Sequence, residues 1–209
     1  MKKTNILDVC CGGKMFYFDK EDSRVLFQDI REVETILCDG RPWKIKPDVV
    51  GDFRSMQFAD GSFSLVVFDP PHLIRNTGKS KFADIYGSLN PKAKPTGWQQ
   101  IKYGALGQTD WQDTLRLGFK ECFRVLRNGG FLIFKWNETD IPLSKILALT
   151  EQKPLLGHRV GKLNKTHWIL FVKEDLVMND FLDDMAVLLG AFCGGCIFYL
   201  FIFLLEKLV

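Results

Sequence analysis

The stretch that decides the fold is Ser64-Leu-Val-Val-Phe-Asp-Pro-Pro-His72. Its four consecutive apolar residues predict a strand buried on both faces, as in a parallel sheet. Pro70 and Pro71 end this strand, because proline has no amide hydrogen to donate to a neighbouring strand. The polar side chains of Asp69 and His72 are therefore expected just beyond the end of a buried strand.

Further apolar runs predict strands at 6–10, 24–29, 48–53, 131–134, 155–160 and 166–172. A helical period of apolar residues predicts a helix over 111–126, and a shorter helix is expected over 141–150. Strands that alternate with helices predict an α/β fold with a Rossmann-like, open, mainly parallel sheet. The last two strands are expected to form a terminal antiparallel hairpin. In such sheets, ligands bind beyond the carboxyl ends of the strands.

Glycines and acidic residues follow several of these strands. Gly12 and Gly13 follow the first strand and suit a tight turn that a ligand approaches closely. Asp29 closes the second strand, about twenty residues after the turn, a spacing that suits a bond to ribose hydroxyls. Asp52 and Phe53 follow the third strand, where a carboxylate and a ring suit an adenine. Taken singly, each feature also fits an ordinary turn or a solvated strand end.

The turn at Asp69 has a specific chemical use. The two prolines hold an extended turn that leaves a backbone carbonyl outside any ladder or helix. The Asp69 carboxylate and this carbonyl can both accept hydrogen bonds from an exocyclic amino group. Such bonds orient the nitrogen lone pair toward an electrophilic methyl group, and methyl transfer depends more on positioning and desolvation than on a strong base.

Taken in order, these motifs resemble those of class I S-adenosylmethionine (SAM)-dependent methyltransferases, over roughly residues 5 to 173. The closest resemblance is to the small phage and prophage DNA methyltransferases of the adenine type. The resemblance implies SAM as the cofactor and an active site centred on four residues, Asp69, Pro70, Pro71 and His72. It also implies cofactor contacts to methionine (Asp8, Cys10, Gly12, Gly13), ribose (Asp29) and adenine (Asp52, Phe53).

Two positions depart from the family pattern. Cys10-Cys11-Gly12-Gly13 replaces the usual Gly-x-Gly of the first turn, and His72 stands where the family has Tyr, Phe or Trp. Methyl transfer to a nucleobase amine, with N6 of adenine in DNA favoured, is the function that the motifs predict. A small molecule, RNA or protein as the substrate, and a non-catalytic membrane-tethered protein, are the alternatives.

The segment after the catalytic motif favours a nucleic-acid substrate. Residues 73–102 contain six lysines or arginines, one acid and three aromatic residues, a composition that suits phosphates and stacked bases. From this segment we expect substrate contacts by Lys79, Lys81 and Trp98, and a solvated loop is the alternative. Trp136 and Asn137, at the end of the 131–134 strand, are also expected to contact substrate, or else to pack on the core.

Composition and the carboxyl-terminal tail complete the prediction. The net charge of +3 over 209 residues is too small to indicate nucleic-acid binding by itself. The six cysteines lack a metal-ligand pattern, so no metal is expected, and the catalytic domain is expected to be cytoplasmic. Residues 185–205 hold no charged residue and predict an apolar helix of about 30 Å, read as a membrane anchor or as a dimer interface. The predicted division is a methyltransferase domain (1–174), a linker (175–184) and this helix.

Overall fold

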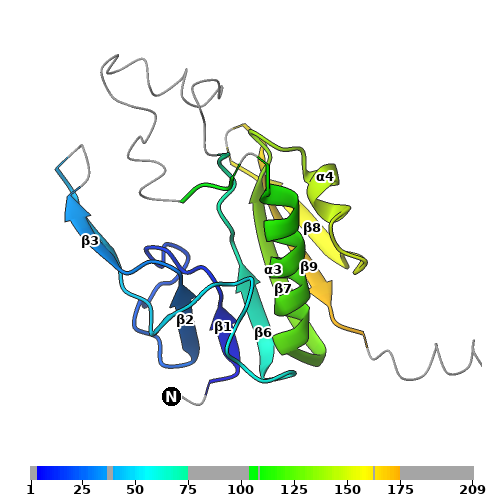
Figure 1. The fold of residues 1–209 in the computed structure, drawn as a ribbon, viewed down its shortest axis with the longest axis horizontal. Helices are drawn as coiled ribbons and strands as arrows, with labels where there is room; N and C mark the ends of the chain where they lie inside the picture. Colours follow the sequence, from blue (N-terminus) through cyan, green and yellow to red (C-terminus); the bar gives the residue numbers. More distant parts are fainter. Residues whose placement is uncertain (1–3, 37–39, 75–103, 108, 162, 175–209) are drawn as a thin grey trace, which may run out of the picture. The chain divides into compact units, whose positions relative to one another are not determined.

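The structure is a computed structural model that describes residues 4–36, 40–74, 104–107, 109–161 and 163–174 (Figure 1). Its main sheet has seven strands in the order β5-β2-β1-β6-β7-β9-β8. These strands are β1 (Ile6–Asp8), β2 (Val25–Asp29), β5 (Val49–Val50), β6 (Phe63–Phe68), β7 (Leu126–Asn137), β8 (Leu156–Val160) and β9 (Thr166–Val172). Two helices, α3 (Trp111–Val125) and α4 (Leu143–Leu147), and a separate hairpin of β3 (Val33–Ile36) and β4 (Pro42–Ile45) complete the described part.

The prediction of a Rossmann-like, mainly parallel sheet is confirmed. Strand β1 pairs in parallel with β2 on one side and with β6 on the other, and β6 pairs in parallel with β7. Only β9 runs antiparallel to its neighbours β7 and β8, which gives the expected terminal hairpin. The chain moves outward from β1 through β2 to β5, and then in the other direction from β6 to β7. The strand order therefore reverses between β1 and β6, which is where α/β sheets bind ligands.

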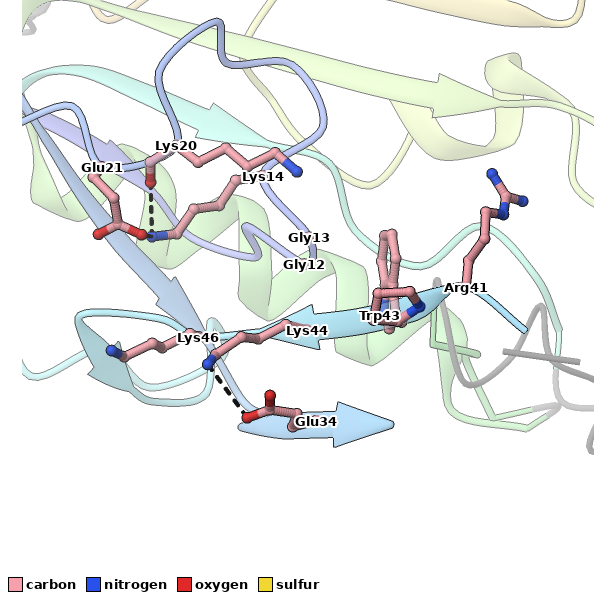
Figure 2. Close-up of a pocket in the computed structure, with 11 residues that line it drawn as sticks. Gly12, Gly13, Lys14, Lys20, Glu21, Glu34, Arg41, Trp43, Lys44 and Lys46 are labelled. Carbon is pink, nitrogen blue, oxygen red and sulfur yellow. Dashed lines mark hydrogen bonds and ion pairs between the residues drawn. The ribbon is translucent and has the colours of Figure 1, made fainter. Parts of the chain in front are cut away.

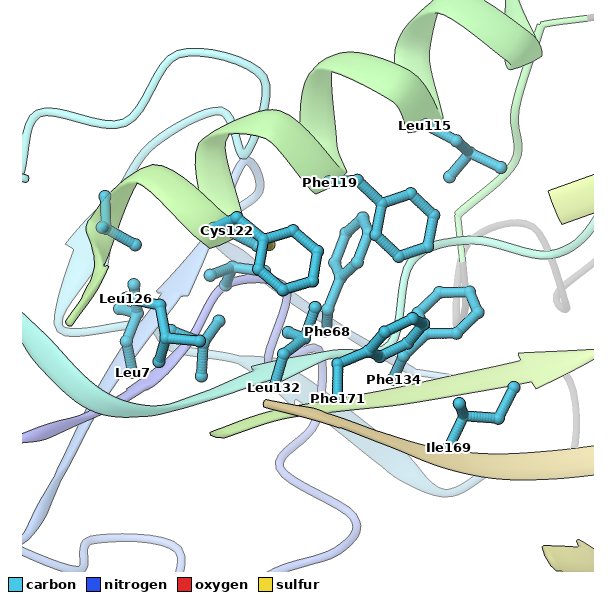
Figure 3. Close-up of a cluster of buried hydrophobic side chains, with 14 of the residues drawn as sticks. Leu7, Phe68, Leu115, Phe119, Cys122, Leu126, Leu132, Phe134, Ile169 and Phe171 are labelled. Carbon is cyan, nitrogen blue, oxygen red and sulfur yellow. The ribbon is translucent and has the colours of Figure 1, made fainter. Parts of the chain in front are cut away.

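The core lies between helix α3 and one face of the sheet (Figure 3). Phe119 of α3 is buried, and its ring centroid lies 5.5 Å from that of Phe68 and 4.9 Å from that of Phe134. Gly118 lets the helix approach the sheet closely, because a Cβ atom there would lie 2.7 Å from the ring of Phe68. Alternate residues of β7, including Leu132 and Phe134, face this core, as the two-residue period of a strand requires.

The glycines that follow helix α3 lie within strand β7. The helix ends at Val125, and Leu126, Arg127 and Asn128 already belong to strand β7. The pairing of β7 with β6 shifts register between Phe63 and Leu65. Gly129, with a φ of 67°, lies in the stretch of β7 opposite this shift. Glycine suits such an irregularity because it adopts positive φ without a steric penalty.

The expected alternation of strands and helices is wrong in the first half of the chain. Residues 9–24, which connect β1 to β2, contain turns and no helix, and residues 51–62 likewise contain no helix. The hairpin β3–β4 takes the place of a helix between β2 and β5. The connection 9–24 holds two glycines and four exposed or half-buried residues in its Met15–Phe18 run, so it presents no single apolar stripe for a helix to bury.

The chain divides into the compact unit Met1–Lys173 and a second unit, Glu174–Val209. The predicted linker and the predicted apolar helix over 185–205 lie outside the described residues. Within the described ranges, the helices fall short of the length and apolarity that a bilayer crossing requires.

A core substitution should separate the buried and exposed faces of α3. Replacing Phe119 with alanine removes a ring that three other rings contact, and should lower the free energy of unfolding by about 3–5 kcal/mol. Replacing Leu117, which is 45% exposed on the same helix, should cost less than about 1 kcal/mol. Urea denaturation of both variants measures the difference, and equal losses would contradict this assignment of the core.

Candidate active site

The first turn is held by the carboxylate of Asp8, the last residue of β1. The backbone N–H of Cys10 donates to Asp8 Oδ1 at 3.2 Å, and the Tyr17 hydroxyl donates to Asp8 Oδ2 at 3.0 Å. Asp8 is only 1% exposed, and this burial raises its pKa to about 7. The negative charges of Asp69 and Asp29 contribute to this rise. Asp29 and Asp69 follow the carboxyl ends of β2 and β6, the strands on either side of β1.

Asp29 joins the end of β2 to the same turn. The backbone N–H of Gly12 donates to Asp29 Oδ2 at 2.9 Å, and Gly12 has a φ of 50°, which glycine adopts readily. On the other oxygen, Asp29 Oδ1 accepts from the backbone N–H of Arg31 at 2.9 Å and from its Nε at 3.1 Å. The carboxylate is 2% exposed, so these bonds replace the water that it would otherwise bind.

Asp69 lies at the end of β6 and is paired with a residue of the neighbouring strand. Lys135 Nζ of β7 lies 3.2 Å from Oδ1 and 3.1 Å from Oδ2 of Asp69. The same ammonium lies 4.5 Å from the ring centroid of Phe16 and 5.8 Å from that of Trp168. Burial raises the pKa of Asp69, and the positive charge of Lys135 opposes this rise. Lys135 therefore favours the ionised form of the carboxylate.

His72 is a neutral imidazole near this pair. Burial, together with the positive charge of Lys135, lowers its pKa to about 4. Its ring lies edge-on to Trp136 with 6.5 Å between the centroids. A neutral imidazole carries one N–H donor and one acceptor nitrogen, so His72 can form polar bonds as well as stack.

The structure brings together three of the four strand-end acids that the sequence singled out. The fourth, Asp52, forms a two-bond ion pair with Arg54, with the shorter contact at 2.6 Å. Phe53, expected to stand beside an adenine, is half-buried and packs edge-on against Phe68, 5.3 Å between centroids. Asp52 and Phe53 thus take part in contacts of their own rather than in the group around Asp8.

Of the two expectations for Trp136, a substrate contact or packing on the core, the structure shows packing on the core. Trp136 is fully buried, its indole N–H donates to the carbonyl of Ile141 at 2.9 Å, and its ring stacks on that of Phe134. The cause is the two-residue period of β7, which turns Trp136 to the core and Lys135 to the other face. Asn137 uses its amide in the terminal hairpin, where it donates to Thr166 and accepts from Thr139.

Other predicted features cannot be placed. Lys79, Lys81 and Trp98, with the rest of the basic segment 75–102, lie outside the described residues. Among the described residues, no group of three potential ligand side chains is arranged to hold a metal ion.

No protein-family model and no curated protein matches the sequence. Several solved structures resemble it. The PH0226 protein of Pyrococcus horikoshii OT3 has a TM-score of 0.48 and 15% identity, with 81% of each chain covered. A SAM-dependent methyltransferase of Methanosarcina mazei has a TM-score of 0.44 and 12% identity, over 83% of this chain and 94% of its own. The N-methyltransferase NodS of Bradyrhizobium japonicum has a TM-score of 0.46 and 12% identity, over 82% and 86%.

The hairpin β3–β4 and the cleft beside it were not predicted from the sequence (Figure 2). The cleft has a volume of about 580 Å³, and Gly12 and Gly13 line it together with side chains of the hairpin. Trp43 of β4 lies close to the glycine turn, because a Cβ atom on Gly13 would be 2.4 Å from its ring. The alternation of Trp43-Lys44-Ile45-Lys46 and the Asp39-Gly40 pair are the signals that would have predicted this hairpin.

The low pKa of His72 can be measured directly. Its imidazole should titrate at about pH 4 in the folded protein, because burial disfavours the charged form. The folded pKa lies below the unfolded one, so neutral His72 contributes stability above pH 6.5 that is lost as the pH falls toward 4. NMR titration of the histidine resonances, with His72→Asn to assign the signal, measures this value. A midpoint near 6.5 would show that the imidazole is solvated.

Proposed function

We propose that this chain is a SAM-dependent methyltransferase that acts on an amine. The observation that carries the proposal is the meeting of Asp8, Asp29 and Asp69 beside a glycine turn. They lie at the carboxyl ends of β1, β2 and β6, where the strand order reverses. This is the position at which an α/β sheet binds a cofactor.

The residues present fit this cofactor in two respects. The buried carboxyl groups of Asp8 and Asp29 create a negative potential, which suits a sulfonium cation, while the charge of Asp69 is offset by Lys135. Gly12 faces open space, since a Cβ atom there would have no neighbour within 4 Å, so the turn leaves room for a ligand against its backbone. Asp29 would hold the ribose hydroxyls by exchanging its bond from Arg31 Nε for bonds from the ligand. The turn from Asp8 to Gly13, with Cys10, would hold the methionine part.

Bound SAM supplies an electrophilic methyl group. Asp69, with the backbone of Pro70 and Pro71, would accept hydrogen bonds from the acceptor amine and orient its lone pair. Burial raises the pKa of Asp69, and Lys135 opposes this rise and so favours the ionised form, which accepts hydrogen bonds. The neutral ring of His72 would contact the acceptor group beside it. The new N–C bond would take both electrons from the amine nitrogen, while the S–CH3 bond would break with its electron pair left on the sulfur, which leaves as a neutral thioether. The proton that the amine loses can pass to Asp69 or to solvent.

We further propose that the amine belongs to a nucleobase, with N6 of adenine in DNA favoured. The order Asp69-Pro70-Pro71 at the end of β6 supports an amino acceptor. His72 in the stacking position leaves RNA, a small molecule or a protein amine as the other candidates, and they are separate arms of the assay below.

Cofactor binding should depend on Asp29 and not on Asp52. Asp29→Ala should abolish SAM binding, because the variant lacks the carboxylate that joins the turn to β2. Asp52→Ala is the matched control, and it should reduce affinity less than about threefold, since this carboxylate pairs with Arg54 outside the group. Calorimetric titration with SAM measures both. An equal loss in the two variants would place the adenine beside Asp52.

Methyl transfer should depend on Asp69 after cofactor binding has occurred. Asp69→Ala should keep SAM affinity but lower the transfer rate at least a hundredfold, because the acceptor amine is no longer oriented. The assay uses SAM with a labelled methyl group and unmethylated DNA, RNA of the same sequence and a low-molecular-weight cell extract. If the chain binds SAM but transfers no label to DNA, the proposal of a DNA substrate is refuted. If label appears in neither DNA, RNA nor the extract, the proposed methyltransferase activity is refuted.

A further inference from the structure

The cleft beside the hairpin is rich in positive charge (Figure 2). Five cationic side chains and two carboxylates line it, which gives the cleft a net charge of +3. The cationic residues are Lys14, Lys20, Arg41, Lys44 and Lys46, and the acidic ones are Glu21 and Glu34. A net positive charge on a concave surface focuses the field on an anionic ligand.

The cations are distributed along the cleft. In Figure 2, Lys44 and Lys46 lie on the hairpin wall, Lys14 and Lys20 on the opposite wall, and Arg41 at the other end. All of these except Lys14 are exposed. Charges in a row suit a ligand that carries repeated negative charges, whereas one compact anion would need them to converge on a point.

The existing contacts of these cations do not prevent binding. Lys44 and Glu34 form an ion pair of 3.3 Å in which both side chains are exposed. Such exposed pairs add only about 0–1 kcal/mol to the stability of a protein. Lys14 is different, because it is buried and donates to the carbonyl of Lys20 at 2.9 Å. Lys14 therefore holds in place the loop of residues 14–21, which forms the wall opposite the hairpin, while Lys44 and Lys46 remain accessible to a ligand.

The cleft is linked to the candidate active site through the glycine turn. Gly12 lines the cleft and also donates its N–H to Asp29. Trp43 lies next to Gly13 and adds an aromatic ring to the hairpin wall, which also carries Lys44 and Lys46. Aromatic rings beside cations are typical of surfaces that bind nucleic acids. A nucleic-acid strand bound in the cleft would therefore pass beside the glycine turn, which is hydrogen-bonded to Asp29.

We propose that the cleft between the 14–21 loop and the β3–β4 hairpin binds the phosphodiester backbone of the nucleic acid that is methylated. This inference rests on the proposed function for the identity of the acceptor. It assigns substrate binding to a hairpin far from the basic segment 73–102 in the sequence. Lys44 and Lys46 contact phosphates and set affinity, without selecting a base.

The test is the salt dependence of binding. A fluorescently labelled 20-base-pair DNA duplex is titrated with the full chain, without SAM, at several KCl concentrations, and anisotropy gives Kd. Replacing Lys44 and Lys46 together with alanine should raise Kd and reduce the slope of log K against log salt by about 2. The control replaces Lys145 and Lys153, two exposed lysines outside the cleft, and should leave the slope unchanged.

The proposal would be overturned by no binding of the duplex to the wild-type chain in low salt, by equal slopes in the two double variants, or by displacement of the duplex by polyglutamate as readily as by unlabelled DNA. RNA of the same sequence and ATP serve as competitors to identify the source of the phosphates. Stronger displacement of the labelled duplex by RNA than by DNA identifies RNA as the substrate. Displacement by ATP alone would overturn the proposal that the cleft binds a phosphodiester backbone.

The same preparations separate this inference from the proposed function. SAM binding, measured by calorimetry, should be equal in the wild type and in the Lys44/Lys46 double variant, because neither lysine contacts Asp8, Asp29 or Asp69. Duplex binding that depends on these lysines, without SAM binding, would refute the proposed methyltransferase activity and support the proposed nucleic-acid cleft. SAM binding without duplex binding would support the cofactor site and refute the nucleic-acid cleft.

Discussion

The carboxyl edge of the sheet depends on the double pairing of strand β1. This strand has only three residues, yet Ile6, Leu7 and Asp8 each have a parallel partner on β2 and another on β6. Parallel pairing on both sides aligns the ends of the three strands. It thereby places Asp8, Asp29 and Asp69 at one edge, although 61 positions separate the first from the last.

Placing buried carboxyl groups together has an electrostatic cost, and each group is compensated differently. Asp8 receives hydrogen bonds from Tyr17 and Cys10, yet its pKa is raised to about 7, so it is partly protonated near neutral pH. Asp29 accepts from the Gly12 N–H and pairs with the Arg31 guanidinium, and Asp69 pairs with the Lys135 ammonium. Asp29 and Asp69 therefore each have a cationic partner, whereas Asp8 is held by uncharged donors. Such differences between neighbouring carboxyl groups are typical of functional sites.

Loops replace helices between the first strands, and this changes the surface around the site. The 14–21 loop and the β3–β4 hairpin provide the two walls of a basic cleft, which meet at the glycine turn. A buried acidic group and an exposed basic cleft thus share Gly12. The first suits a cation and a hydrogen-bond donor, and the second suits a polyanion. A methyl transfer from a sulfonium to a base in a nucleic acid would require both.

The sequence by itself determined the strands and their polar ends. Continuous apolar runs predicted β1, β2 and β6, because strands buried on both faces need them. Apolar runs also predicted β7 and the terminal hairpin, whose strands are buried on one face or exposed. Only the tertiary structure decided which ends meet and what they contact. It paired Asp69 with Lys135 and turned Trp136 into the core, since partners across strands depend on register. It also replaced expected helices with a loop and a hairpin, whose short alternating runs gave weaker local signals than the buried strands.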